Sequence, residues 1–382
     1  MLRIEKRQTS QTSTSILVGI VAIVLALAIS TLVLSIMGYK PIEIFAKAFG
    51  QTYFTVPGIL ENLLMLIPLS LCALAVAVAA KAGLWNIGVE GQFFAGAAAA
   101  AGVAMAFPNL PAPLLLILMF LAGAVVAGLL AYISVLPRIY LGISEILTTI
   151  LMNSVVIYFI RYLVFDAWDD PATVAPQTPP FAEAARLPIL IADSRVHIGF
   201  LIVIGVIILV HYFVNRTVYG YELRAVGENI RGAKYAGINI RKYFFVAMFL
   251  SGALAGIAGM MEVSGVVHRL QPTISADYGF SAFVIAWVAR LGTGAILIVS
   301  YLFAGLLVAG FTMQMMGIPS MVISMLKGLI LLLVLAGEVL TVYKFTWTRE
   351  QPQKGRLMVD SSETGNVGQD SCEIPRTAGE ER

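Results

Sequence analysis

About ten long apolar runs dominate this chain of 382 residues, and they limit its fold more than any other feature. A helix that crosses a membrane needs roughly 20 apolar residues, and it satisfies its own backbone polar groups there. The runs predict an all-α polytopic membrane protein with about ten transmembrane or partly re-entrant helices. The predicted spans cover residues 16–37, 57–80, 86–106, 113–135, 143–165, 197–214, 243–263, 277–289, 295–316 and 319–342.

The eighth run, residues 277–289, is too short to cross a bilayer comfortably. We interpret it as a broken or re-entrant segment. Such a segment is tolerated at membrane depth only where protein or a cavity buries it.

Composition agrees with a membrane protein and argues against a catalytic or metal-binding one. Hydrophobic residues make up 59% of the chain and charged residues 12%, about half the share found in globular domains. Its two cysteines, Cys72 and Cys372, and its three scattered histidines have no spacing typical of a disulfide framework or a metal site. No catalytic constellation is evident, so we expect neither a metal nor a cofactor in this chain.

Basic residues indicate the orientation of the chain, because cytoplasmic loops are enriched in Lys and Arg. The first apolar run is longer than a signal peptide's and is interpreted as a retained span. With residues 1–15 inside, the inner loops hold Arg3, Lys6, Arg7, Lys81, Arg138, Arg216, Arg224, Arg231, Lys234, Arg241, Lys242 and Arg290. The outer loops hold only Lys40, Lys47, Arg186, Arg195 and Arg269, which places both termini in the cytoplasm.

This orientation divides the chain into a membrane domain, residues 16–342, and a polar tail, residues 343–382. The proline-rich loop 166–196 is external, and its composition favours an irregular cap over a folded domain. The tail is cytoplasmic, and its composition favours disorder.

The cytoplasmic loop 215–242 carries six Lys or Arg residues and also several helix formers. Two glycines, Gly227 and Gly237, are placed where they would end short helices. One interpretation is a solvated basic loop that only fixes the topology. The other is a short cytosolic helix that docks on a partner protein.

The stretch ELRAVGENIRGAKYAGI within this loop resembles the cytoplasmic loop of ABC-importer permeases that couples to the ATPase. The chain from about residue 50 to 342 is similar to the permease family serving branched-chain amino acids, ribose-type sugars and nucleosides. It is most similar to the nucleoside and simple-sugar subgroup, whose type II ABC-importer fold we therefore expect. The stretches that carry the resemblance are KAGLWNIGVEGQFFAGA, GISEILTTILMN, YGFSAFVIAWVARL and GIPSMVISMLKGLILLLVLAGE.

The resemblance implies a bacterial or archaeal cytoplasmic membrane and a set of partners. These are two cytosolic ATPases that use ATP and Mg, a second permease, for this subgroup a different and shorter one, and an extracytoplasmic solute-binding lipoprotein. No G-x-x-x-x-G-K-[ST] phosphate loop is present, so a separate chain is expected to hydrolyse ATP. The expected ATPase-coupling residues are Glu222, Ala225, Gly227, Asn229, Ala233, Ala236 and Gly237. Gly232 departs from the usual alanine pair and is expected to loosen a docking helix by about 1 kcal/mol.

Polar residues within the apolar runs are the candidates for a solute path, because ionisable groups at membrane depth are costly. Asn86, Glu90 and Gln92 open the third span, where Asn86 is predicted to be the N-cap and Glu90 to lie in the first turn. Glu90 is therefore expected either to stabilise this helix end or to hold an inner gate.

Glu145, Thr149 and Asn153 follow at four-residue spacing and are predicted to share one helix face. That face could line a path for a hydroxylated solute. The alternative is that Ser144 caps the helix while Glu145 interacts with its dipole.

The sequence leaves two transporter classes open. One is an ABC-importer permease for a nucleoside or sugar-like solute. The other is an ion-coupled secondary transporter of a small polar solute, with Glu145 or Lys327 as the coupling charge. For Lys327 we expect a partner or a water cavity, and for Glu262 a solvated place near the outer surface.

Overall fold

The computed structural model describes residues 2–6 and 12–347. The described residues fall into two compact units: residues 2–5 together with 344–347, and residues 6 and 12–343. Strands β1 (Leu2–Lys6) and β2 (Tyr343–Trp347) form a two-stranded sheet. The first residues of the predicted tail are thus a strand, and the predicted disorder beyond residue 347 lies outside the described residues.

All ten predicted spans are helical, and seven helices within the described residues are long and apolar enough to cross a membrane. The expected all-α polytopic architecture is confirmed. The helices that match the predicted spans are α1 (Thr12–Ile36), α3 (Val56–Lys81), α4 (Val89–Ala106), α5 (Ala112–Leu141), α6 (Glu145–Tyr162), α7 (Gly199–Arg216), α10 (Ile240–Glu262), α11 (Tyr278–Val288), α12 (Thr293–Met315) and α13 (Ser320–Val342).

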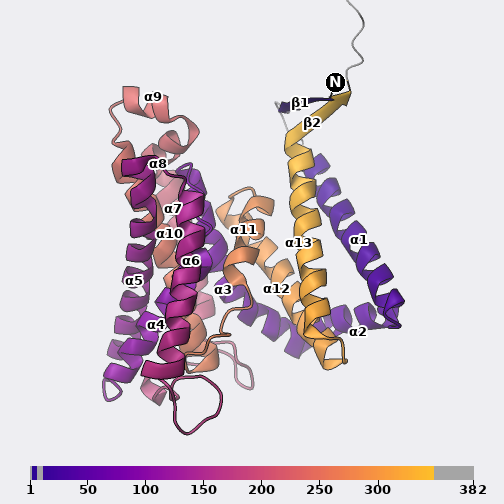
Figure 1. Cartoon of the computed structure of the whole chain (residues 1–382), viewed down its shortest axis with the longest axis vertical. Coiled ribbons are helices and arrows are strands. Elements are labelled where there is room, and N and C mark those ends of the chain that lie inside the picture. The colour runs from indigo at the N-terminus through magenta and orange to yellow at the C-terminus, as the bar shows by residue number, and fades with distance from the viewer. Residues whose placement is uncertain (1, 7–11, 348–382) are drawn as a thin grey trace, which may run out of the picture. The chain divides into compact units, whose positions relative to one another are not determined.

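Three further helices lie between the spans. Helix α2 (Pro41–Phe54) occupies a segment predicted to be an outer loop, and it buries one face through Ile44, Ala48 and Thr52. Helices α8 (Val218–Glu228) and α9 (Ile230–Tyr235) form the loop that resembles the coupling loop. They lie at one end of the helical unit, hereafter the α8–α9 end, while the segment 168–198 lies at the opposite end (Figure 1).

Side-chain caps define where several helices begin. Thr55 accepts a hydrogen bond from the Gly58 N–H at the start of α3, and Thr217 accepts one from Gly220 at the start of α8. Asn239 caps α10 in the same way. Each cap satisfies a backbone donor that has no partner within its own helix.

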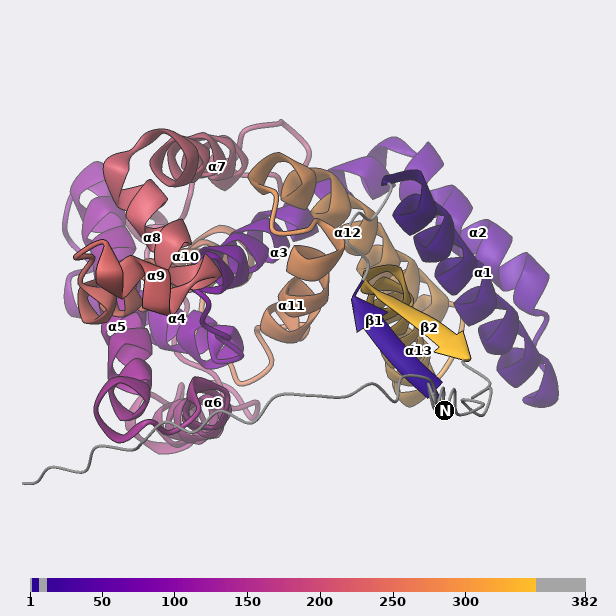
Figure 2. The ribbon, with the colours of Figure 1, turned by 90° about the horizontal axis from the view of Figure 1, so that it is seen from above.

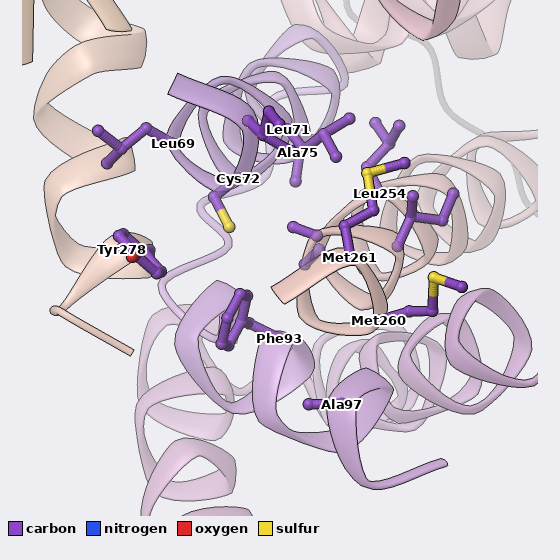
Figure 3. Packing of buried hydrophobic residues seen from close by; sticks show 14 of the residues in the cluster. Leu69, Leu71, Cys72, Ala75, Phe93, Ala97, Leu254, Met260, Met261 and Tyr278 are labelled. Carbon is purple, nitrogen blue, oxygen red and sulfur yellow. The ribbon is translucent and has the colours of Figure 1, made fainter. Parts of the chain in front are cut away.

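Helix α10 lies at the centre of the larger helix group, against α3, α4 and α5 (Figure 2). Its glycines allow the close packing that their small size predicts. A Cβ on Gly256 would lie 2.2 Å from the Gly123 carbonyl oxygen, and one on Gly259 would lie 2.0 Å from the Phe93 carbonyl oxygen. Figure 3 shows the apolar core that results, with Cys72, Phe93, Met261 and Tyr278 drawn from α3, α4, α10 and α11.

Helices α1, α2, α12 and α13 form a second group, connected to the first through contacts of α3 with α2, α11 and α12 (Figure 2). Helix α11 has 11 residues and spans about 16 Å, roughly half the thickness of a bilayer's hydrocarbon core. Tyr278, its first residue, is buried and donates a hydrogen bond to the Met65 sulfur in the middle of α3. The short eighth segment is therefore a half-helix that begins inside the protein, as its length predicts.

The segment 168–198 is largely irregular, with one 3₁₀ turn (Glu183–Ala185), and it is fixed to the chain that follows α10. After α10 comes a π-helical turn, Val263–Val267. Thr178 and Phe181 donate backbone hydrogen bonds to the carbonyls of Leu270 and His268, at 3.0 and 2.8 Å. We call residues 168–198 with 264–274 the cap.

Candidate translocation and coupling site

The segment 82–91 comprises the connection from α3 to α4 and the first three residues of α4. The polar residues singled out by the sequence all meet around it. The candidate path residues Asn86, Glu90, Gln92, Glu145, Thr149 and Asn153 are all at most 4% exposed. We call them the buried framework. They come from two segments more than fifty residues apart, so tertiary packing is what brings them together.

Asn86 and Gln92 form a reciprocal amide pair. The Asn86 Nδ2 donates to the Gln92 Oε1 at 2.8 Å, and the Gln92 Nε2 donates back to the Asn86 Oδ1 at 3.1 Å. The Asn86 Nδ2 also donates to the Ser251 hydroxyl at 2.8 Å, and that hydroxyl donates to the Ala75 carbonyl. One network therefore ties the segment 82–91 to α3, α4 and α10, and burial makes each bond costly to lose.

The prediction that Asn86 is the N-cap of α4 is wrong. The helix begins at Val89 with Gly88 as its N-cap, and the Asn86 Oδ1 accepts a hydrogen bond from the Gly88 N–H at 3.0 Å. This is an Asx turn, which precedes the helix and competes with capping for the same side chain.

Glu145, Thr149 and Asn153 do share one buried face of α6, as their spacing predicts. The Asn153 Oδ1 accepts a hydrogen bond from the Gly91 N–H at 2.7 Å, and its Nδ2 donates to the Ile87 carbonyl at 2.8 Å. The Thr149 hydroxyl bonds back to the Glu145 carbonyl of its own helix. In the structure this face holds the segment 82–91 in place.

Glu145 lies in the first turn of α6 and joins three elements. Its Oε1 accepts a hydrogen bond from the Trp85 N–H at 3.2 Å, and its Oε2 lies 3.4 Å from the Arg138 Nε at the end of α5. Ser144 is the N-cap residue, but its side chain makes no capping hydrogen bond. The expected serine cap is therefore wrong, while the position of Glu145 near the positive end of the helix dipole is as expected.

Glu90 binds the start of the half-helix α11. Its Oε2 accepts a hydrogen bond from the Gly279 N–H at 2.6 Å. A Cβ on Gly279 would lie 2.4 Å from the Glu90 backbone nitrogen, so glycine permits this approach. Glu90 thus supplies a negative charge to the N-terminus of α11, which a helix dipole favours, rather than a side-chain cap to its own helix.

Aromatic side chains join the same segment to the other end of α11. The Trp85 ring lies 5.1 Å from the Trp287 ring and 5.8 Å from the Phe283 ring, centroid to centroid. Segment 82–91 therefore contacts both ends of the half-helix: Glu90 at its first turn and Trp85 at its last.

The predicted coupling residues gather around a groove of about 490 Å³ between α8 and α9. Of the seven, the groove is lined by Glu222, Ala225, Asn229, Ala233 and Ala236. The Asn229 side chain caps α9 by accepting from the Gly232 N–H at 2.9 Å. Gly237 follows α9 with a φ of +78°, a left-handed conformation that ends the helix as predicted.

Gly227 does not end a helix; it lies within α8, facing away from the groove. A Cβ on it would lie 2.2 Å from the Lys81 carbonyl oxygen and 2.9 Å from the Gly83 nitrogen. Gly227 therefore lets α8 lie directly on the start of segment 82–91. Leu84 and Val226 are fully buried in one apolar cluster that reinforces this contact.

Sequence reasoning missed the residues that complete the framework: Ser251, Arg138 and Gly279. Each is ordinary in its local context, since Ser251 lies in a small-residue stretch and Gly279 at a helix start. Two of the three lie more than 150 residues from their partner. Of the three, only Gly279 carries a local signal, because a glycine can mark a place where two backbones approach closely.

The remaining ionisable groups have partners or burial that the sequence did not show. The Lys327 Nζ lies 2.9 Å from the Asp277 Oδ2, so the expected partner exists. Glu262 is 5% exposed and lies near the ion pair between Arg195 and Glu61, so the expected solvation is wrong. Within residues 2–6 and 12–347, no group of three or more His, Cys, Asp and Glu residues is placed to hold a metal ion.

Two histidines lie in or beside the cap. Burial lowers the pKa of His197 to about 4, and the nearby His268 adds to the shift. The His197 Nδ1 accepts a hydrogen bond from the Gly199 N–H at 3.1 Å, which only an unprotonated nitrogen can do. Burial also lowers the pKa of His268, against the opposing effect of its hydrogen bond to the Ser264 carbonyl.

Comparison with known proteins adds the family context. A family model described as the permease component of branched-chain amino acid transport systems matches residues 58–335. The guanosine ABC transporter permease protein of Bacillus subtilis (strain 168) is 30% identical over 326 residues, covering 84% of this chain and 92% of that protein. The glucose ABC transporter permease protein of Haloferax volcanii is 29% identical over 354 residues, covering 90% and 93%. A nucleoside ABC transporter permease protein of Lactococcus lactis is 29% identical over 325 residues, covering 83% and 89%.

Proposed function

Because this chain belongs to the family of branched-chain amino acid transport permeases and is a permease subunit of an ABC importer, we propose that it carries a nucleoside or a related sugar-like solute inward. Its relatives are named for guanosine, glucose and nucleosides. The chain is a multi-pass membrane protein and not itself an enzyme. Permeases of this type work with ATPase, binding-protein and permease partners, which argues against an ion-coupled secondary transporter.

The observation that carries the mechanism is the contact of Gly227 with the start of segment 82–91. Closure of the ATPases around ATP moves α8 and α9, through the groove that we propose as their docking site. Because α8 lies directly on Lys81 and Gly83, the movement is passed to segment 82–91. Packed elements transmit such shifts as rigid bodies.

The buried framework then passes the movement to α11. Asn86, Gln92 and Asn153 make segment 82–91 rigid, while Trp85 and Glu90 contact the two ends of the half-helix. A displacement of the segment therefore tilts or shifts α11, which begins inside the membrane domain. In this account the six framework residues gate the path by positioning α11, and none of them breaks a bond in the solute.

The assembly that we propose follows from the same premise. Two cytosolic ATPases dock on the permeases, hold ATP and Mg, and leave this chain without a cofactor. A second, shorter permease completes the membrane core, and a solute-binding lipoprotein docks outside, on the side of the cap. The chain lies in a bacterial or archaeal cytoplasmic membrane with both termini inside, consistent with the basic residues at the α8–α9 end.

Uptake by the complete importer in proteoliposomes tests this function. With the binding protein outside and ATP inside, we expect ATP-dependent uptake of uridine, of glucose, or of both, that a protonophore leaves unchanged. A non-hydrolysable ATP analogue in place of ATP is the matched control. Uptake that persists without ATP hydrolysis and collapses with the protonophore would contradict the proposal.

A further inference from the structure

A second cavity, of about 480 Å³, lies between α1, α2, α12 and α13 and the segment that leads into α11. Drug-sized ligands occupy pockets of roughly 300–1,000 Å³, so a small solute fits this volume. The start of α13, the end of α12 and one face of α2 line the cavity, which places it toward the end opposite α8 and α9. In the proposed orientation, an imported solute arrives from this side.

The cavity combines two kinds of surface. Phe45 and Phe49 of α2 present aromatic rings whose centroids are 6.2 Å apart. The same cavity is also lined by the Asp277–Lys327 ion pair and by Gln314 and Ser324. Among the described residues, Gln314 and Ser324 have no side-chain hydrogen-bond partner, so they are free to bind a solute.

The ion pair connects the cavity to the half-helix. Asp277 is the N-cap residue of α11, with a φ of +63°, and the Lys327 Nζ also lies 3.4 Å from the Ala276 carbonyl oxygen. Glu90 binds the same turn through the Gly279 N–H. A solute that hydrogen bonds with Asp277 therefore contacts the residue directly before the helix that the framework positions.

We propose that this cavity is a solute site within the permease and that it takes a nucleoside. The flat base lies against Phe45 and Phe49, since aromatic rings favour offset or edge contacts. The ribose hydroxyls bind Asp277 and Lys327, as acceptor and donor, and the Gln314 amide is placed for the polar edge of the base. A hexose has hydroxyls for the polar surface formed by Asp277 and Lys327, but it has no flat base to lie against Phe45 and Phe49. The inference rests on the proposed importer function and names its solute class.

Protection of an introduced cysteine tests the site without relying on transport. Ser324→Cys places a thiol in the cavity, and Met325→Cys places one on the neighbouring position that does not line it. Both are made in a Cys372→Ser background, where Cys72 is buried. In the complete importer, we expect uridine to slow maleimide labelling of Ser324→Cys several-fold, to leave Met325→Cys unchanged, and glucose to have little effect.

Further substitutions separate the two surfaces. Asp277→Asn and Phe49→Leu are each expected to raise the uridine concentration for half-protection about tenfold, since each removes a favourable contact of the bound solute. Phe49→Tyr keeps the ring and should retain protection, which separates loss of the site from loss of the fold. Glu43→Gln and Phe54→Leu, on the same helix but outside the cavity, should leave protection unchanged.

Failure of this inference and of the proposed function can be told apart. Importers that take up solute with ATP but show equal labelling with and without uridine would overturn the site. Protection by glucose and not by uridine would overturn the nucleoside assignment. Absence of ATP-driven uptake in the unmodified importer would instead overturn the function on which the site rests.

Discussion

Single side chains hold the segment 82–91 by hydrogen bonding with its backbone groups. Asn153 satisfies both the Gly91 N–H and the Ile87 carbonyl while being 4% exposed. A buried polar group that loses its partner costs about 1–3 kcal/mol. Loss of such a side chain is therefore expected to lower the stability of the membrane domain, in addition to any effect on the position of α11.

Asn153→Leu is expected to destabilise the membrane domain by about 2–4 kcal/mol, because it leaves two buried backbone groups unpaired. Thermal unfolding of the purified permease in detergent measures this loss. Val155→Leu, at a position on the same helix that is 60% exposed, serves as the matched control. An Asn153→Leu protein as stable as the control would show that this side chain does not hold the segment.

Glu90→Gln should assemble normally, because the amide oxygen still accepts the Gly279 N–H. The negative charge at the start of α11 is lost, and such charges contribute about 0.3–2 kcal/mol near a helix N-terminus. We expect a small loss of thermal stability and a clear loss of ATP-driven uptake. Uptake at the wild-type rate would indicate that the charge of Glu90 has no part in gating.

The helices α8 and α11 each make a backbone-to-backbone approach that only glycine permits. Gly227 brings α8 onto the end of α3, and Gly279 brings α11 onto Glu90. These two positions lie at opposite ends of the proposed route from the groove to the half-helix. Alanine at such a glycine can therefore be compared with alanine at a glycine whose added Cβ would make only ordinary contacts.

Gly227→Ala should displace α8, because its Cβ would lie 2.2 Å from a backbone oxygen. Gly232→Ala meets only ordinary contacts with Asn229, at 3.4 Å or more, and should stabilise α9 by about 0.5–1 kcal/mol. Co-purification of the ATPase measures both. We expect it to fall with Gly227→Ala and to be kept or improved with Gly232→Ala, and equal recovery with the two variants would refute the coupling role.

The cap should weaken as the pH falls from about 6.5 to about 4. The pKa of His197 is about 4 in the folded protein, below the ordinary value of 6.5, so the unfolded cap binds more protons in this range. The loss is at most about 3 kcal/mol. Hydrogen exchange of residues 185–200 as a function of pH measures it, and His197→Gln, which keeps an acceptor but does not titrate, should flatten the dependence. An unchanged slope in that variant would exclude His197 as the cause.

Helices of the membrane domain could be predicted from the sequence where a single residue pattern determines their position. Apolar length alone located the ten spans, and the shortness of residues 277–289 indicated the half-helix α11. Helix α2 was missed because it buries a single face and is too polar for a span. The four-residue spacing of Glu145, Thr149 and Asn153 predicted that they share one helix face. It did not predict which segment that face contacts.

Contacts between distant segments could not be predicted from the sequence. The pairs Glu90–Gly279 and Lys327–Asp277 depend on how α11 lies against α4 and α13, and no local pattern encodes that arrangement. For the same reason, Asn86 was expected to cap a helix, although its amide is used by Gln92 and Ser251.

For the whole membrane domain, the structure describes a continuous set of contacts from the α8–α9 groove to the half-helix. The steps are Gly227 on Gly83, the framework around segment 82–91, and Glu90 and Trp85 on α11. Coupling between two sites requires more than a continuous set of contacts. It requires an element that has two arrangements, and both sites must shift the equilibrium between those arrangements. We propose that α11 is this element.

Hydrogen exchange of the assembled importer, with and without ATP, shows whether α11 responds to the ATPases through segment 82–91. We expect ATP to change the exchange of residues 82–91 and 275–282 together with that of 218–235. We expect Glu90→Gln to uncouple 275–282 from the other two segments. An ATP-dependent change confined to residues 218–235, with 82–91 and 275–282 unaltered, would contradict the proposed role of α11.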